Sequence, residues 1–73
     1  MQWAAIVGAN IRRLRKAKGL TQEKLAQEAD MAMRYVAGVE RGEENPSLRF
    51  LVKMAEVLGV GPGELFESGQ TSK

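Results

Sequence analysis

The sequence contains no cysteine and no histidine among its 73 residues. The lack of cysteine excludes disulfide bonds and thiolate metal sites. The lack of histidine removes the usual zinc ligand sets and the commonest general base of enzymes, so no metal ion or other cofactor is predicted. A chain of this length is near the lower limit for a single hydrophobic core. We therefore expect one domain that depends on apolar packing, within the chain or against a second copy.

Long hydrophobic segments are also absent. The apolar segment AAIVGA, residues 4–9, is far too short to cross a bilayer. The N-terminal sequence lacks the basic region and the apolar run of a secretory signal. We therefore predict a cytoplasmic protein that does not associate with membranes. A second domain that would hold a small-molecule effector is not evident, and no effector is predicted.

The charged residues are unevenly distributed, although the net charge is only +2. Residues 1–24 carry six basic side chains and one acidic side chain, giving +5, whereas residues 25–73 carry five basic and eight acidic ones, giving −3. Such an excess of positive charge favours an anionic partner, such as nucleic acid, on the N-terminal side. The alternative is a solvated helix face without a partner, which is the commoner role of charged runs.

Apolar residues recur at spacings of three and four, which is the pattern of amphipathic helices. A second, short helix is predicted over Gln22–Ala29, with Thr21 as its N-cap. The first predicted helix ends before Gly19, and its apolar face is formed by Trp3, Ile6, Val7, Ile11 and Leu14.

A third predicted helix follows the second after only a few residues. Asp30 caps it if it begins at Met31, and Gly42 ends it. Its apolar face is formed by Ala32, Tyr35, Val36 and Val39. Two short helices joined by a tight turn are the helix-turn-helix pattern. A generic small helical bundle predicts the same spacing, so these patterns leave both folds open.

Two further helices are predicted in the last third of the chain. One extends from Leu48 to Leu58, between the N-cap Ser47 and the terminating Gly59. Pro62 suits the start of a last short helix, Gly63 to about Glu67. Since no segment alternates between apolar and polar residues for long enough to form a strand, the chain is predicted to be all-α with five helices.

Several short motifs carry a resemblance to a known family. Together they resemble the Cro/C1-type, or XRE-like, helix-turn-helix transcriptional regulators, whose DNA-binding domain is lambda-repressor-like. The likeness covers roughly residues 11–66 and includes restriction–modification controller proteins and antitoxin-type repressors, which it does not separate from stand-alone regulators. The motifs are, in order, Gly19-Leu20-Thr21-Gln22, Leu25-Ala26, Glu40-Arg41-Gly42, Asn45-Pro46-Ser47-Leu48, Leu58-Gly59-Val60 and Glu64-Leu65-Phe66.

The resemblance implies a homodimer that binds double-stranded DNA at a pseudo-palindromic operator. The third helix of each copy would enter the major groove, with half-sites about 34 Å apart. The chain would then consist of a helix-turn-helix domain over residues 1–67 and a flexible C-terminal tail over residues 68–73. Arg15 and Glu40 match a common buried ion pair that ties the first helix to the end of the third.

The same resemblance assigns the residues that would contact DNA. The base-facing positions are Met33, Arg34, Ala37 and Gly38. For phosphate contacts the resemblance points to Gln22 and Tyr35, and the basic residues Arg41 and Arg49 are further candidates.

Among the base-facing residues, Arg34 alone can form strong hydrogen bonds to a base. Arg34 can bind guanine O6 and N7 in a bidentate manner, whereas Met33 and Ala37 can contact thymine methyl groups. Gly38 has no side chain to read with, but it permits a close approach of the backbone to the groove. Alternatively, Met33 and Arg34 are ordinary surface side chains without a DNA contact.

The chain departs from the family pattern at several positions. Ala32 stands where the family usually has a serine or threonine cap, and Asp30 stands in place of the turn glycine. Glu43 and Glu44 occupy a loop that often carries phosphate-binding lysines. These departures concern affinity and specificity rather than the fold.

The sequence also offers more large apolar side chains near its C-terminal end than one small core requires. Part of this set is predicted to pair two copies, and the alternative is that its members close the core of the single chain. The set comprises Phe50, Met54, Val60, Leu65 and Phe66.

Two other functions compete with DNA binding. A helix-turn-helix domain with an apolar third helix would also suit a protein-interaction module, with Met33, Ala37 and Gly38 as its contact surface. An enzyme is the weakest hypothesis, because no nucleophile–base pair is visible without histidine or cysteine.

Overall fold

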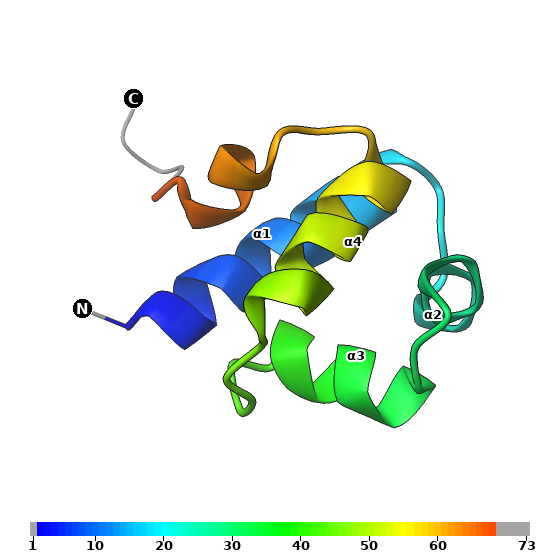
Figure 1. The fold of residues 1–73 in the computed structure, drawn as a ribbon, viewed down its shortest axis with the longest axis horizontal. Coiled ribbons are helices and arrows are strands. Elements are labelled where there is room, and N and C mark those ends of the chain that lie inside the picture. Colours follow the sequence, from blue (N-terminus) through cyan, green and yellow to red (C-terminus); the bar gives the residue numbers. More distant parts are fainter. Residues whose placement is uncertain (1, 69–73) are drawn as a thin grey trace.

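The computed structural model describes residues 2–68, which form four α-helices and one short 3-10 helix (Figure 1). The predicted all-helical fold with a helix-turn-helix is confirmed. Apart from Ser68, the predicted C-terminal tail lies outside the described residues. The elements are α1 (Trp3–Ala17), α2 (Gln22–Ala29), α3 (Met33–Glu40), α4 (Leu48–Leu58) and η1 (Pro62–Phe66).

The predicted count of five helices is wrong, because the last segment, η1, is a 3-10 helix rather than an α-helix. Its backbone bond runs from Glu64 N–H to the carbonyl of Gly61, three residues back, at 3.0 Å. Pro62 starts this segment without an N–H group, and the glycines on either side of it are weak helix formers. Such a short sequence forms a single tight turn more readily than a propagated α-helix.

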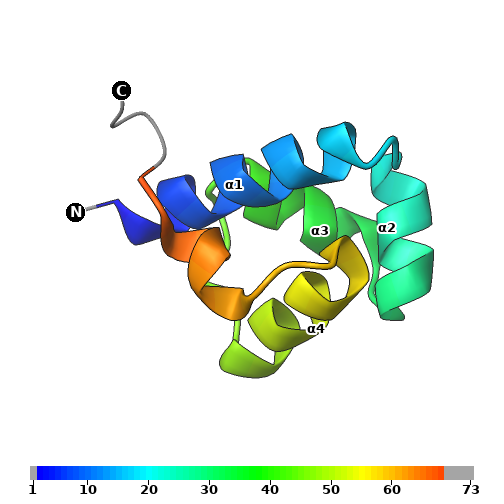
Figure 2. The same cartoon turned by 90° about the horizontal axis from the view of Figure 1, so that it is seen from above.

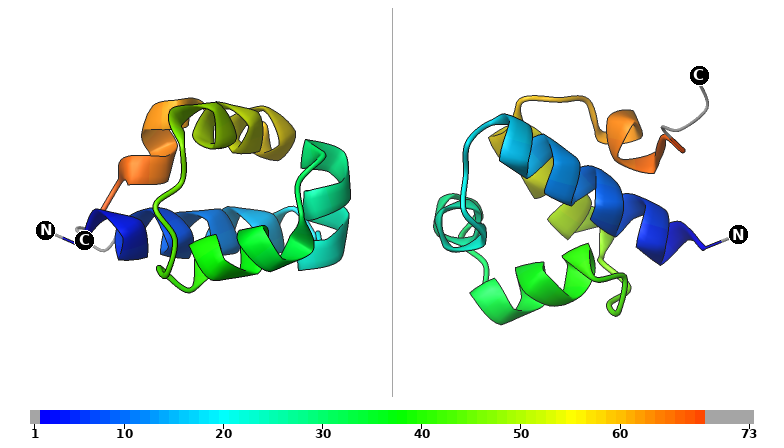
Figure 3. Two further views of the ribbon diagram at one scale, coloured as in Figure 1. Left: turned by 60° about the horizontal axis from the view of Figure 1, so that its bottom comes forward. Right: turned by 180° about the vertical axis from the view of Figure 1, so that it is seen from behind.

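The helices pack around α1, which contacts α3, α4 and η1 (Figures 1 and 2). Helix α2 crosses α3 steeply and also contacts α4, so it closes one end of the fold. At the opposite end, the Trp3 and Phe66 rings meet edge to face with centroids 5.9 Å apart. Helix α3 lies at the periphery, and one of its sides is not covered by another helix (Figure 3). None of the helices within residues 2–68 has the length and hydropathy required to cross a membrane.

The core is filled by side chains from every helix. Ile11, Leu25 and Val36 have no exposed surface, and they come from α1, α2 and α3. Helix α4 and η1 add large side chains to the same cluster. Burying such side chains supplies the main favourable free energy of folding in a chain without disulfides.

The buried positions of three of these side chains correct the predicted dimer surface. Phe50, Met54 and Leu65 are at most 1% exposed, so they fill the core of the single chain and cannot meet a second copy. They are among the largest fully buried side chains, so the core of the single chain requires them. The other two members of that set differ: Val60 is half-buried against the core, and Phe66 is 39% exposed.

The turn between α2 and α3 differs in detail from the predicted one. Asp30 adopts the left-handed conformation, with φ 57° and ψ 47°, and ends α2 rather than capping α3. Helix α3 begins at Met33, and its N-cap, Ala32, makes no side-chain hydrogen bond. Aspartate tolerates the left-handed region better than most residues, which permits the tight turn without a glycine.

Gly8 allows α1 and the end of α3 to approach closely. A Cβ atom at this position would lie 2.8 Å from the carbonyl oxygen of Glu40 and closer still to that of Val39. Both obstacles are backbone atoms, which cannot rotate away as a side chain would. Only glycine therefore fits at this crossing.

We predict that Gly8→Ala destabilises the protein by about 1–3 kcal/mol, the usual cost of overpacking a close contact. Chemical denaturation monitored by circular dichroism measures this difference. Gly63→Ala is the matched control, because no atom lies within 4 Å of the corresponding Cβ position. Equal stabilities of the two variants would show that α1 and α3 do not approach as closely as described.

Candidate nucleic-acid interface

The uncovered side of α3 presents the residues assigned to base reading. Met33 is 49% exposed, and Arg34 is exposed beside it. Ala37 is half-buried one turn further along. Within residues 2–68, no carboxylate lies within ion-pair distance of Arg34. The guanidinium is therefore available for an external hydrogen-bond acceptor.

Gly38 differs from the other three residues assigned to base reading, because it is buried. Its missing side chain leaves a space that is occupied by Glu44 from the following loop. A Cβ atom on Gly38 would lie 2.8 Å from Cγ of Glu44 and 3.2 Å from its Oε2. The expected open approach of the backbone to a groove is therefore replaced by a carboxylate lying over the helix.

A buried ion pair fixes α3 against α1. Arg15 donates from Nε to Glu40 Oε2 at 2.7 Å and from Nη2 to Glu40 Oε1 at 3.0 Å. The third nitrogen, Nη1, donates to the carbonyl of Leu20 at 2.8 Å. The two side chains are only 10% and 2% exposed. This bidentate geometry is the strongest form of an arginine–carboxylate contact, and it links α1, the turn before α2 and the end of α3.

Gln22, a predicted phosphate contact, joins the same network. Its Nε2 donates to Glu40 Oε1 at 3.0 Å, and the residue is half-buried at the first position of α2. The amide thus satisfies a further lone pair of the buried carboxylate. This contact was not predicted from the sequence, because it depends on how the start of α2 meets the end of α3.

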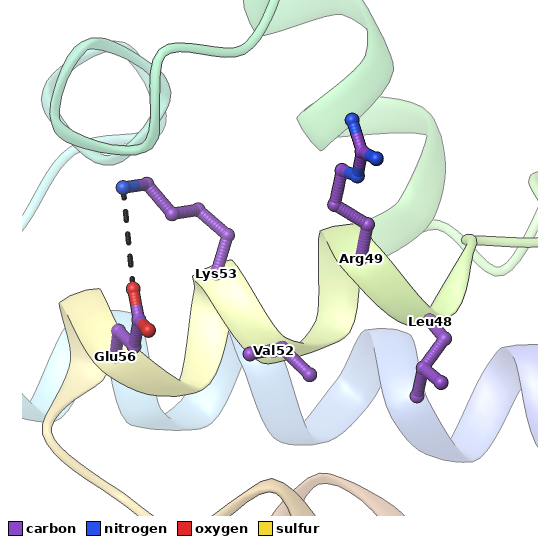
Figure 4. Close-up of a pocket in the computed structure, with 5 residues that line it drawn as sticks. All are labelled: Leu48, Arg49, Val52, Lys53 and Glu56. Atoms are coloured by element: carbon purple, nitrogen blue, oxygen red, sulfur yellow. Dashed lines mark ion pairs between the residues drawn. The ribbon is translucent and has the colours of Figure 1, made fainter.

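The other phosphate candidates have different surroundings. The Tyr35 ring packs edge to face on Phe50, with centroids 4.9 Å apart, and the residue is half-buried. Arg49 is exposed and points toward the side of α2 and α3 (Figure 4). Together with Lys53 it borders a depression next to the α2–α3 turn. Both basic side chains therefore lie at the edge of the helix-turn-helix.

Arg41 is held by an acidic neighbour. Its Nη2 lies 3.0 Å from Oε1 of Glu43, and both side chains are more than half exposed. The hydrogen bond and the charge of Glu43 raise the pKa of Arg41 above its ordinary value, with a smaller contribution from the charge of Glu44. Arg41 must exchange this carboxylate for a phosphate if it is to contact DNA, which reduces its contribution to binding.

Asn10 is a structural residue that sequence analysis missed. Its Nδ2 donates to the carbonyls of Leu65 at 2.8 Å and Glu67 at 2.7 Å, and so holds the end of η1 and the residue after it on α1. Its Oδ1 accepts from Nη2 of Arg13 at 3.1 Å. The sequence feature that could have revealed this role is the position of Asn10 on the apolar face of the first helix beside Ile11. A polar residue at such a position requires buried hydrogen-bond partners.

The comparisons with known proteins agree with this geometry. A family model described as helix-turn-helix matches residues 11–65. The chain belongs to the Cro/C1-type helix-turn-helix family. It is 40% identical over 65 residues to an uncharacterized HTH-type transcriptional regulator, y4dJ, of Sinorhizobium fredii, which covers 89% of this chain and 84% of that protein.

Two solved structures show how far the likeness extends. The restriction–modification controller protein C.AhdI of Aeromonas hydrophila is 46% identical with a TM-score of 0.84, over 86% of this chain and 96% of that one. SinR, the master regulator for biofilm formation, was solved in complex with DNA. It is 37% identical with a TM-score of 0.80, over 84% of this chain and 98% of that one.

We predict that Glu40→Ala lowers the free energy of unfolding by about 3–5 kcal/mol, since it leaves the buried Arg15 without a counter-charge. Thermal denaturation would show a sharp fall in melting temperature. Glu28→Ala is the matched control, because Glu28 pairs with Lys24 at 3.9 Å on an exposed helix surface. That variant should lose well under 1 kcal/mol. An unchanged melting temperature for Glu40→Ala would exclude a structural role for the pair.

Proposed function

We propose that the protein is a cytoplasmic transcriptional regulator that binds a palindromic operator as a homodimer, with α3 of each copy in the major groove. The observation that carries this proposal is the exposed Arg34, which has no ion-pair partner within residues 2–68. It lies on the uncovered side of an α3 that the Arg15–Glu40 pair holds in place. A rigidly held helix keeps its side chains in one register on the bases, which sequence readout requires.

The reading chemistry follows from the side chains on that surface. Arg34 suits guanine, whose O6 and N7 accept two parallel hydrogen bonds, with about 1–3 kcal/mol of discrimination against other bases. Met33 and Ala37 offer apolar surface for thymine methyl groups. The combination favours a half-site that contains guanine next to thymine.

Several groups around α3 support phosphate binding. The start of α2 presents backbone N–H groups and the positive end of the helix dipole beside Gln22. Arg49 and Tyr35 flank the helix-turn-helix, and Arg41 contributes once it leaves Glu43. Few of these groups are freely available cations. We therefore expect the affinity for DNA to depend less steeply on salt concentration than that of lysine-rich relatives.

The homodimer requires an apolar surface that leaves α3 free. Leu48 is 75% exposed and Val52, one turn later on α4, is 38% exposed. In Figure 4, Leu48 points to the side opposite that of Arg49 and Lys53, and therefore away from the helix-turn-helix. Trp3 and Phe66 border a neighbouring depression with Leu51. We assign the contact between copies to Leu48 and Val52, with Phe66 at its margin.

A protein-interaction module remains the second candidate, because the half-exposed Met33 gives α3 an apolar surface. The two functions differ in one respect that an experiment can measure. A module of this kind would not discriminate between duplex sequences.

Selection of bound duplexes from a random DNA pool at near-physiological salt tests the DNA-binding function. We expect enrichment of an inverted repeat with a guanine in each half-site. Arg34→Ala should lose the guanine preference, and Lys53→Ala, which removes a cation outside α3, should retain it. If the wild-type protein enriches no sequence, α3 does not read bases and the protein-interaction module is favoured.

Sedimentation velocity tests the assigned contact between copies. A Leu48→Glu, Val52→Glu double variant should sediment as a monomer at concentrations where the wild type is a dimer, because two buried carboxylates without partners oppose association. The matched control is Glu23→Gln with Glu28→Gln on α2, which should remain dimeric. A double glutamate variant that is still dimeric would exclude this surface of α4.

A further inference from the structure

The reading surface of α3 contains one position without a side chain of its own. Arg34 and Gly38 are four residues apart, so they occupy the same side of the helix on successive turns. Residues in this relation carry side chains about 5–6 Å apart at their Cβ atoms. A side chain at residue 38 would therefore stand next to Arg34, toward the end of α3.

That space is taken by Glu44. Its Cγ and Oε2 lie 2.8 Å and 3.2 Å from the position that a Cβ atom on Gly38 would occupy. The carboxylate is therefore beside the helix and within the row that begins with Arg34. A side chain at residue 38 and the side chain of Glu44 cannot occupy the same space. The glycine at residue 38 therefore allows Glu44 to lie there.

The backbone of the loop holds Glu44 in this place. Glu43 N–H donates to the carbonyl of Gly38 at 2.9 Å, and Gly42 N–H donates to that of Val39 at 3.0 Å. Gly42, with φ 77°, lies so near α1 that a Cβ atom on it would be 3.1 Å from Cα of Ala5. The loop is thus hydrogen-bonded to α3 and packed close to α1, which places residue 44 beside Gly38.

The two neighbouring acidic residues differ in their partners. Glu43 forms the ion pair with Arg41, whereas no basic side chain of residues 2–68 lies within 4.0 Å of the Glu44 carboxylate. Glu44 therefore keeps its acceptor oxygens available on the same side of α3 as Arg34. A carboxylate so placed is complementary to one feature of the major groove, the exocyclic N4 amino group of cytosine.

We propose that Glu44 is a specificity-determining residue, which takes the place of the absent side chain at residue 38 and accepts a hydrogen bond from cytosine N4. With Arg34 on guanine, the pair selects a guanine and a cytosine at nearby positions of each half-site. The negative charge of Glu44 also opposes phosphate binding by this loop. Glu44 therefore lowers the affinity for DNA of any sequence while it adds selectivity for one base. This inference rests on the proposed function and adds a second base to the readout.

The same duplex selection tests the inference with three variants. Glu44→Ala removes the carboxylate and should reduce the preference for cytosine by roughly tenfold, while the guanine preference remains. Gly38→Ala displaces the Glu44 side chain without changing the net charge, and should lose the cytosine preference in the same way. Glu67→Ala removes an equal charge beyond η1, and should select the wild-type sequence.

The outcomes separate the inference from the function on which it rests. A Glu44→Ala variant that binds every duplex more tightly with an unchanged base preference would show that the carboxylate only repels phosphate, and would overturn the inference alone. Retention of the cytosine preference by a folded Gly38→Ala variant, verified by its melting temperature, would do the same. No enrichment by the wild type would overturn both.

Discussion

The position of α3 depends on one buried pair, Arg15 and Glu40. Helix α3 has eight residues and no capping side chain at its start, so it would not be stable in isolation. The bidentate contact, with Leu20 and Gln22 as further partners, fixes the end of α3 relative to α1 and α2. A buried ion pair contributes little net stability compared with apolar packing. Removal of one partner is nevertheless strongly destabilising, because it leaves the other charge buried without a counter-charge. The pair therefore determines where α3 lies, whereas the core determines whether the chain folds.

Two glycines complete this arrangement, one on α1 where it meets α3 and one on α3 itself. Gly8 lets α1 reach the backbone of Val39 and Glu40, which brings Arg15 within bonding distance of the carboxylate. Gly38 leaves room for Glu44 on the opposite, exposed side. Each glycine costs helix stability of about 1 kcal/mol relative to alanine, which the packing of α3 must offset. The surface of α3 is consequently formed by its own side chains together with one from the next loop.

Much of the fold was predictable from the sequence, because helix spacing and end signals are local. Thr21 and Ser47 cap α2 and α4 through hydrogen bonds to Lys24 N–H and Phe50 N–H, as their side chains suggested. Helical spacing alone left the start of α3 open, because Asp30 serves equally well as a cap or as a left-handed residue. The last helix was overestimated because Pro62 and Gly63, with Gly61 before them, favour a 3-10 turn over an α-helix.

Contacts between distant segments were less accessible to sequence reasoning. Helix α4 is apolar on most of its circumference, so its sequence does not distinguish buried Phe50 and Met54 from exposed Leu48 and Val52. That distinction depends on where α1 and η1 lie. The position of Glu44 over Gly38 likewise follows from the path of a loop, whereas the Arg15–Glu40 pair was predicted only through the family resemblance.

Titration of ¹⁵N-labelled protein with its selected duplex, followed by amide chemical shifts, tests most directly whether α3 is the DNA-contacting element. The largest changes are expected in α3, at the start of α2 and around Glu44, with the outer side of α4 unaffected. Changes confined to α1 or α4, with α3 unperturbed, would show that α3 is not the element that contacts DNA.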